Sequence, residues 1–198
     1  MDNLVLDGGF VDLVKDSQSV FRTVMDALSR PGLKQPIHVD AAPPAPLSPE
    51  VAAIALTLAD HDSPVWLDET LAASEAVVAW LKFHTGAPIV SDPREADFAL
   101  VTGWATLPRL DAFGIGSDEY PDRSTTVVLA VEGFDGADRT ITGPGIKDTG
   151  TLTIAGITGD FIAQWALNRE LFPCGVDVVF AGAGQVVGLP RTTRIVEA

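Results

Sequence analysis

Residues 176–189 read Val-Asp-Val-Val-Phe-Ala-Gly-Ala-Gly-Gln-Val-Val-Gly-Leu and contain two short apolar runs, Val176 to Ala181 and Val186 to Leu189. The segment that joins the runs, Gly182-Ala183-Gly184-Gln185, is made of small and polar residues, which is typical of the turn of a β-hairpin. This stretch therefore predicts a pair of antiparallel strands near the end of the chain.

Short apolar runs elsewhere predict further strands. These are residues 65–67, 89–90, 98–102, 125–131 and 139–142. Residues 33–39 also look extended, but Pro36 lacks the amide donor that an inner strand needs, which indicates the edge of a sheet. Helical segments lie between these runs, so the sequence favours an α/β fold in which helices flank a mixed β-sheet.

Two of the four predicted helices, residues 12–29 and 160–171, have one apolar side. We expect the first to turn these side chains toward the core: Phe21, Val24, Met25 and Leu28. We expect Asp160 to cap the second helix. Its expected inward side chains are Phe161, Ile162, Trp165 and Ala166.

The other two predicted helices are residues 51–59 and 74–84. Ser48-Pro49-Glu50 has the order of a helix start, and the helix that follows is apolar nearly all round. Such a helix must be buried on most sides, either between a sheet and another layer or between two subunits. The helix over 74–84 should turn Val77, Val78, Trp80 and Leu81 inward and end at Gly86, which can adopt the left-handed conformation of a C-cap.

The length and charge of the chain limit its functions. With 198 residues, residues 1–198 are expected to form a single domain. Lys and Arg number 13 and Asp and Glu number 27, which gives a formal charge of −14. This charge repels nucleic acid and anionic membrane surfaces, so neither is an expected partner. An anionic substrate would need a local cationic pocket.

Cysteine content and the N-terminal sequence predict a cytoplasmic protein. Cys174 is the single cysteine and cannot form an internal disulfide, and the N-terminus lacks the pattern of a signal peptide. No apolar run reaches the roughly 18 residues that suggest a membrane span.

The histidines are the first candidates for acid–base or metal chemistry, because His titrates near neutral pH and ligates metals. Asp60-His61-Asp62 is more typical of a solvated turn than of a metal site, and His38 stands alone in an exposed position. His84 ends a predicted helix, where it could donate a hydrogen bond to an anion or cap the last carbonyl groups. No set of metal ligands is expected.

Other short motifs also lack a catalytic pattern. Gly143-Pro144-Gly145 resembles a structural turn more than a phosphate cradle, because it lacks the Lys and Ser/Thr that follow glycines in a P-loop. Cys174 has no neighbouring His and is expected to be a packed residue. We therefore predict no catalytic residue.

The segment Pro190-Arg191-Thr192-Thr193-Arg194 concentrates two guanidinium groups and two hydroxyls in an acidic protein. Arginine matches the paired oxygens of phosphate and carboxylate, so this segment is a candidate for anion recognition. The alternative is that its arginines pair with acidic side chains of the same chain.

Five motifs, taken in order, resemble those of the PhnH family, which belongs to the bacterial carbon-phosphorus lyase system. They are Phe21-Arg22 with Arg30-Pro31-Gly32; Leu56 to Asp60 with Pro64 to Leu67; Lys82 to Pro88; Phe172 to Asp177; and Leu189 to Thr193. The resemblance covers almost the whole chain. It departs most over residues 103–122, and Lys82 stands where the family usually has Arg.

The resemblance implies a reduced pyridoxal-phosphate-dependent transferase fold in a homodimer. It does not imply the cofactor, because such enzymes need a buried lysine for the Schiff base. None of Lys15, Lys34, Lys82 and Lys147 lies in a motif for that role. No pyridoxal phosphate and no other cofactor is expected.

The resemblance also implies partners and a reaction. PhnG, PhnH, PhnI and PhnL transfer the ribose-triphosphate group of ATP to an alkylphosphonate and release adenine, and PhnH joins PhnG, PhnI and PhnJ in a core complex. The binding or interaction candidates are the polar side chains in the matching motifs. They are Arg22, His84, Thr85, Asp177, Arg191, Thr192 and Thr193.

Three hypotheses follow. The chain is a structural and interaction subunit, or an enzyme in its own right that uses His84 and Arg191, or a module that binds phosphonate through Arg191 or Arg22. The first hypothesis agrees best with the absence of a recognisable nucleophile–base pair or a set of metal ligands. Under this hypothesis we expect Arg191→Ala to keep the fold and to weaken assembly with PhnI or phosphonate-dependent growth.

Overall fold

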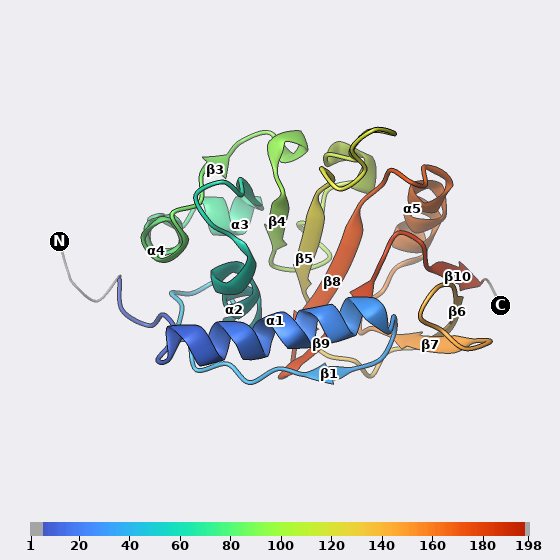
Figure 1. Ribbon diagram of the computed structural model, residues 1–198, viewed down its shortest axis with the longest axis horizontal. Helices are drawn as coiled ribbons and strands as arrows, with labels where there is room; N and C mark the ends of the chain where they lie inside the picture. The colour runs from blue at the N-terminus through green and yellow to red at the C-terminus, as the bar shows by residue number, and fades with distance from the viewer. Residues whose placement is uncertain (1–5, 197–198) are drawn as a thin grey trace.

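A seven-stranded mixed sheet lies at the centre of the computed structural model, which describes residues 6–196 (Figure 1). The strand order is β1-β9-β8-β5-β4-β2-β3. The strands are β1 (Gln35–Pro36), β2 (Val65–Leu67), β3 (Ile89–Val90), β4 (Phe98–Val101), β5 (Thr126–Ala130), β8 (Asp177–Gly182) and β9 (Gln185–Leu189). Five of them, β3, β2, β4, β5 and β8, run parallel, while β9 and β1 are antiparallel to their neighbours. The prediction of a mixed sheet is confirmed.

The predicted hairpin is formed by β8 and β9. Its two central turn residues, Ala183 and Gly184, have φ values of 48° and 69°. Two successive left-handed residues make the turn that best matches the twist of the flanking strands. β1 pairs with β9 at the edge of the sheet, as Pro36 predicted.

Helices and a small second sheet cover the two faces of the central sheet (Figure 1). One face is covered by α1 (Leu13–Ser29), α2 (Pro49–Leu58), α3 (Glu69–Ala72) and α4 (Glu75–Thr85). The other face is covered by α5 (Gly159–Glu170) and by the small sheet of β6 (Asp138–Thr142), β7 (Gly150–Thr153) and β10 (Arg194–Val196). The elements α3, β7 and β10 are too short to show a periodic pattern, and the sequence did not indicate them.

Alternate side chains of the parallel strands point into separate cores. Leu100, Val128 and Val179 pack with the first group of helices, whereas Val127 and Phe180 pack with α5 and the small sheet. Strands buried on both faces read as continuous apolar runs, which is why the sequence marked them clearly.

Helix α2 lies between the sheet and other helices of the same chain. Its residues Val51 to Ala55 are all buried, and it contacts α1, α4, β5 and β8. The nearly all-apolar composition is therefore explained by an internal layer, the first of the two alternatives that the sequence left open. The Ser48 cap is confirmed, since its hydroxyl accepts a hydrogen bond from the Val51 amide.

The predicted end of α4 is also confirmed. Gly86 caps the helix with φ 72°, and Val77, Trp80 and Leu81 are buried. Val78 is partly buried against the same core.

The inward side of α1 differs from the prediction. Val20, Val24 and Ala27 are buried, and Leu28 is partly buried, whereas Phe21 and Met25 are exposed. Two neighbouring stripes of α1 both have helical spacing, so periodicity alone cannot choose between them. The small Ala27 lies inward because its backbone approaches Gly188 of β9 closely.

Two expectations for α5 are also wrong. The cap is Thr158, whose hydroxyl accepts from the Phe161 amide, while Asp160 accepts from the Gln164 side chain. The helix starts one residue earlier than expected, which places the threonine at the cap. Phe161 and Trp165 are buried as expected, but Ile162 is only half-buried and Ala166 is exposed.

Candidate functional site

The strongest polar cluster joins Arg191 to Asp177 at the start of β8. The Arg191 amide donates to Asp177 Oδ1 at 2.7 Å, and Nε lies 3.2 Å from both carboxylate oxygens. Nη2 donates to the same carboxylate and to the Ser124 hydroxyl. Nη1 donates to the carbonyl oxygens of Pro121, at 3.0 Å, and Pro173, at 3.3 Å.

This cluster uses the whole hydrogen-bonding capacity of the arginine. Every guanidinium nitrogen of Arg191 has a partner within the chain, and the side chain is only 12% exposed. The structure thus favours the alternative in which Arg191 pairs with an acid of its own chain. The guanidinium ties the last hairpin strand to the loops before β5 and β8.

Thr192 and Thr193 lie beside this cluster but have different environments. Thr193 is buried, and its carbonyl oxygen accepts a hydrogen bond from Trp165 Nε1 at 2.8 Å. Its buried hydroxyl has no hydrogen-bond partner within residues 6–196. Thr192 borders a hollow of about 280 Å³ together with Pro144, Arg169 and Phe172.

His84 and Thr85 lie at the end of α4. The Thr85 hydroxyl donates to the Leu81 carbonyl oxygen at 2.7 Å and accepts from the Ala87 amide at 3.0 Å, so it stabilises the helix end. The His84 ring centroid lies 4.6 Å from that of Trp80, and a side chain at Gly9 would collide with the ring. Its buried Nε2 has no hydrogen-bond partner within the described part of the chain.

Arg22 is exposed on α1 and borders a polar hollow with Gln18, Thr23 and Gln35. No hydrogen bond or ion pair within residues 6–196 connects Arg22, His84 and Arg191. The structure therefore unites Arg191 with Asp177, keeps Thr192 and Thr193 beside them, and places Arg22 on α1 and His84 with Thr85 at the end of α4.

Sequence reasoning missed a buried carboxylate, Asp68, at the carboxyl end of β2. Its Oδ2 accepts from the Thr102 amide at 2.7 Å, from the Thr102 hydroxyl at 2.6 Å and from the Thr106 hydroxyl at 2.5 Å. Its Oδ1 accepts from the Leu71 amide and caps α3. The sequence contained a signal for this contact, because Asp68 directly follows the predicted strand over 65–67 and Thr102 ends the predicted strand over 98–102.

Asp68 lies where the strand order reverses. From β2 the chain goes to β3 on one side and then returns to β4 on the other side of β2. Open α/β sheets bind ligands in the crevice outside the carboxyl ends of such strands. In this chain the loops after β2 and β4 are tied together there by the Asp68 carboxylate.

A groove of about 480 Å³ lies beside this point, at the carboxyl ends of β4 and β5. Its lining residues are Thr102 to Ala105, Ala130 to Glu132, Ala155 and Gly156. Trp104 Nε1 donates to the Ala155 carbonyl oxygen at 2.8 Å and closes one side. The lining includes an exposed carboxylate, Glu132, and no Lys, Arg or His among the described residues, so the groove does not favour an anion.

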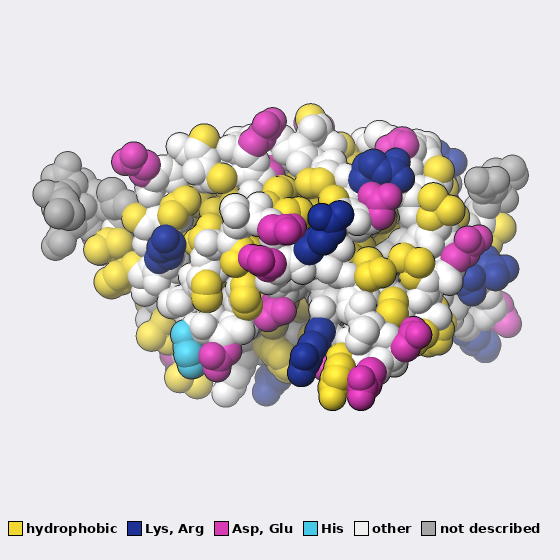
Figure 2. Space-filling view, turned by 90° about the horizontal axis from the view of Figure 1, so that it is seen from above, with side chains coloured by type: hydrophobic (Ala, Val, Ile, Leu, Met, Phe, Trp, Pro, Cys, Tyr) yellow, Lys and Arg dark blue, Asp and Glu magenta, His cyan; other side chains and the backbone are white. Residues whose placement is uncertain are grey.

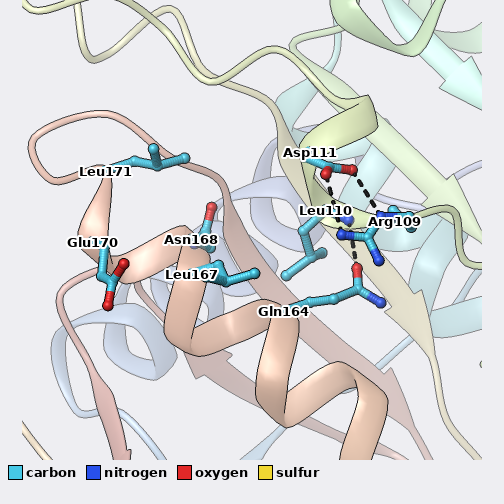
Figure 3. Close-up of a pocket in the computed structure, with 8 residues that line it drawn as sticks. All are labelled: Arg109, Leu110, Asp111, Gln164, Leu167, Asn168, Glu170 and Leu171. Atoms are coloured by element: carbon cyan, nitrogen blue, oxygen red, sulfur yellow. Dashed lines mark hydrogen bonds and ion pairs between the residues drawn. The ribbon is translucent and has the colours of Figure 1, made fainter.

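A second hollow, of about 240 Å³, lies between α5 and a short 3₁₀ turn at Leu110–Ala112 (Figure 3). Leu110, Leu167 and Leu171 line it together with polar side chains. The Leu110 amide donates to Gln164 Oε1 at 2.9 Å, and Arg109 pairs with Asp111 at its rim. The hollow is apolar, with charges at the edge.

The remaining candidates show no catalytic arrangement. Burial raises the pKa of the Cys174 thiol, and Asp118 beside it raises it further, so the thiol is a poor nucleophile at neutral pH. The Gly143 to Gly145 turn packs on the backbone of Thr192 and Ser29. Within residues 6–196 no group of three or more His, Cys, Asp and Glu side chains is placed to hold a metal ion.

The visible surface shows no block of basic side chains. Seen from above, Lys and Arg side chains stand singly among acidic and hydrophobic ones (Figure 2). Across residues 6–196, no helix is both long enough and apolar enough to cross a membrane.

The sequence matches the model of one protein family, described as "Bacterial phosphonate metabolism protein (PhnH)", over residues 8–196. A Rhizobium meliloti (strain 1021) protein named alpha-D-ribose 1-methylphosphonate 5-triphosphate synthase subunit PhnH is 44% identical over 192 residues, which cover 96% of each chain. A Stutzerimonas stutzeri protein named putative C-P lyase subunit protein HtxG is 32% identical over 182 residues, or 90% of this chain and 85% of that protein. The family model spans residues 8–196 and the first of these relatives is similar over nearly its whole length, so the chain belongs to the PhnH family of bacterial phosphonate metabolism proteins.

Proposed function

We propose that this chain is a subunit of the enzyme that transfers the ribose-triphosphate group of ATP to an alkylphosphonate with release of adenine. The observation that supports this most is the 44% identity, across 96% of both chains, to a protein named as the PhnH subunit of such a synthase. In this proposal PhnG, PhnI and PhnL act with the chain, and PhnG, PhnI and PhnJ assemble with it.

The role within the enzyme is structural and not catalytic. Arg191 and Asp68 are polar side chains with several hydrogen bonds each, and their partners lie in loops of the same chain. A catalytic group must face a reacting atom within hydrogen-bond reach. Neither side chain offers such an open position.

The proposal includes a fold related to pyridoxal-phosphate-dependent transferases that binds no cofactor. The strand reversal at β2 and β4 supports a relation to open α/β folds. All four lysines, Lys15, Lys34, Lys82 and Lys147, are exposed. A Schiff base with pyridoxal phosphate needs a lysine in a site that holds the cofactor. The purified protein should therefore show no borohydride-reducible chromophore.

The test is release of adenine from ATP in the presence of methylphosphonate. The lone chain should release none above background, whereas PhnG, PhnI and PhnL together should need the chain for activity. Adenine release by the lone chain would support the alternative, an enzyme that uses His84 and Arg191. If the Arg191→Ala and His84→Ala variants of the lone chain released as much adenine, the activity would belong to a contaminating enzyme.

A further inference from the structure

Helix α5 has apolar residues on its outer side as well as its inner side. Phe161 and Trp165 face the core, yet the outer side carries the exposed apolar residues Ala163, Ala166, Leu167 and, at the C-cap, Leu171, which we call the α5 outer face. The exposed Glu170 lies on the same side. Leu167 is 58% exposed. A helix at the surface of a lone globular protein normally turns polar residues to water, so this face is suited to a partner.

Hollows lie on both sides of the α5 outer face. On one side is the apolar hollow between Leu110, Leu167 and Leu171, of about 240 Å³ (Figure 3). On the other side a hollow of about 270 Å³ is lined in part by Ala166, Arg169 and Arg194. Ridges of side chains on a second helix fit grooves of this kind, and small residues such as alanine let two helix backbones approach closely.

The carboxylate of Glu170 lines both hollows, and the two sides differ in their arginines. Arg109 is already paired with Asp111 beside the first hollow. Beside the second, Arg169 and Arg194 form no ion pair within residues 6–196, and the buried Nε of Arg169 has no hydrogen-bond partner there. Unpaired arginines at the edge of an apolar contact favour carboxylates on the partner.

We propose that the α5 outer face binds an amphipathic helix of another subunit of the enzyme. This helix fills the two hollows with apolar side chains and places a carboxylate against Arg169 and Arg194. The inference rests on the proposed function, which supplies the partner. A second copy of this chain fits less well, because the exposed alanines of its own α5, Ala163 and Ala166, are too short to fill the hollows.

The experiment co-expresses a tagged form of the chain with PhnG, PhnI and PhnJ and measures how much of each partner co-purifies. Leu167→Glu puts a charge into the apolar contact and should reduce recovery of the partner at least about ten-fold, which is a typical effect at the centre of an interface. Arg169→Glu should also reduce recovery, whereas Arg169→Lys should keep part of it. Thermal melts of the lone variants should stay close to that of the unchanged chain.

The matched control is Leu33→Glu, because Leu33 is exposed to almost the same degree as Leu167, at 56%, and lies just before the edge strand β1. It should leave co-purification unchanged. If the unchanged chain recovers no partner, the proposed function fails and this inference fails with it. If the unchanged chain and Leu167→Glu recover equal amounts, the α5 inference alone is overturned. It is also overturned if Leu167→Glu halves the mass of the lone protein, because the face would then contact a second copy.

Discussion

Arg191 and Asp177 show how one ion pair organises several loops of this protein. The pair is partly buried, with the two side chains 12% and 23% exposed, and its hydrogen bonds reach Ser124, Pro121 and Pro173. Removing one partner of such a pair leaves the other charge without compensation in a poorly solvated place. The stability of the lone subunit is therefore expected to depend on Arg191.

We predict that Arg191→Ala lowers the free energy of unfolding by about 3 kcal/mol, as is typical when one partner of a buried pair is lost. For a chain of this length that loss corresponds to a fall of roughly 6 to 12 °C in Tm. Thermal melts of the lone subunit measure it. Arg22→Ala, which removes an exposed arginine, should change stability by less than about 0.5 kcal/mol. An equal Tm for Arg191→Ala and Arg22→Ala would contradict the assignment of Arg191 and Asp177 as a stabilising ion pair.

The stability of the protein should also depend on the carboxylate of Asp68. We predict that Asp68→Asn lowers stability by on the order of 2 kcal/mol, because the amide cannot accept all the hydrogen bonds that the carboxylate accepts from Thr102, Thr106 and Leu71. Chemical denaturation measures the change, and hydrogen exchange at the Thr102 amide should speed up. Asp62→Asn, on an exposed turn, serves as the control. Unchanged exchange at Thr102 would show that Asp68 does not hold the loop.

The contact between α1 and β9 depends on a residue without a side chain. A Cβ at Gly188 would lie 2.5 Å from the Ala27 carbonyl oxygen and 2.7 Å from the Leu28 amide nitrogen. These are backbone atoms of α1, which cannot move independently. The helix can therefore lie this close to the strand only with glycine at position 188.

We predict that Gly188→Ala destabilises the fold by about 2 kcal/mol, because overpacking forces α1 away from the sheet. Gly159→Ala is the matched control, since a Cβ there meets nothing within 4 Å and lies in the first turn of α5. Denaturant titration of both variants measures the difference. Equal free energies of unfolding for Gly188→Ala and the control would mean that α1 moves away from β9 without loss of stability.

The whole molecule exposes several large apolar side chains to solvent. The apolar helix over 51–59 does not supply a dimer contact, because α2 is internal, and Trp80 and Trp165 are also buried. Exposed apolar side chains lie instead on α1, with Val14, Phe21 and Met25, and on the α5 outer face. Surfaces of this kind are expected where a chain meets a partner.

The homodimer stays a prediction on these grounds. Light scattering of the purified chain at micromolar concentration should give twice the mass of one chain, 20.8 kDa. Phe21→Glu and Met25→Glu together, on the exposed side of α1, should lower that mass if α1 contributes to the contact. A mass of one chain for the unchanged protein at every concentration would contradict the dimer.

The sequence by itself determined the local elements of this protein. The hairpin, the Ser48 cap, the Gly86 cap and the buried parallel strands depend on residues that are close in the chain, so their signals are visible in a short window. The sequence of the hairpin also indicates the ion pair of Arg191 with Asp177. Because Val178 lies opposite Leu189, Asp177 must lie close to Arg191.

Only the tertiary structure decided which sides of the helices face inward and which polar groups meet. Phe21 and Val24 belong to different stripes of one helix, and the choice depends on Gly188, far along the chain. Asp68 and Thr102 are brought together because β2 and β4 are neighbours in the sheet. These contacts depend on strand order and on the fit between layers, which are properties of the folded chain and leave no periodic pattern in the sequence.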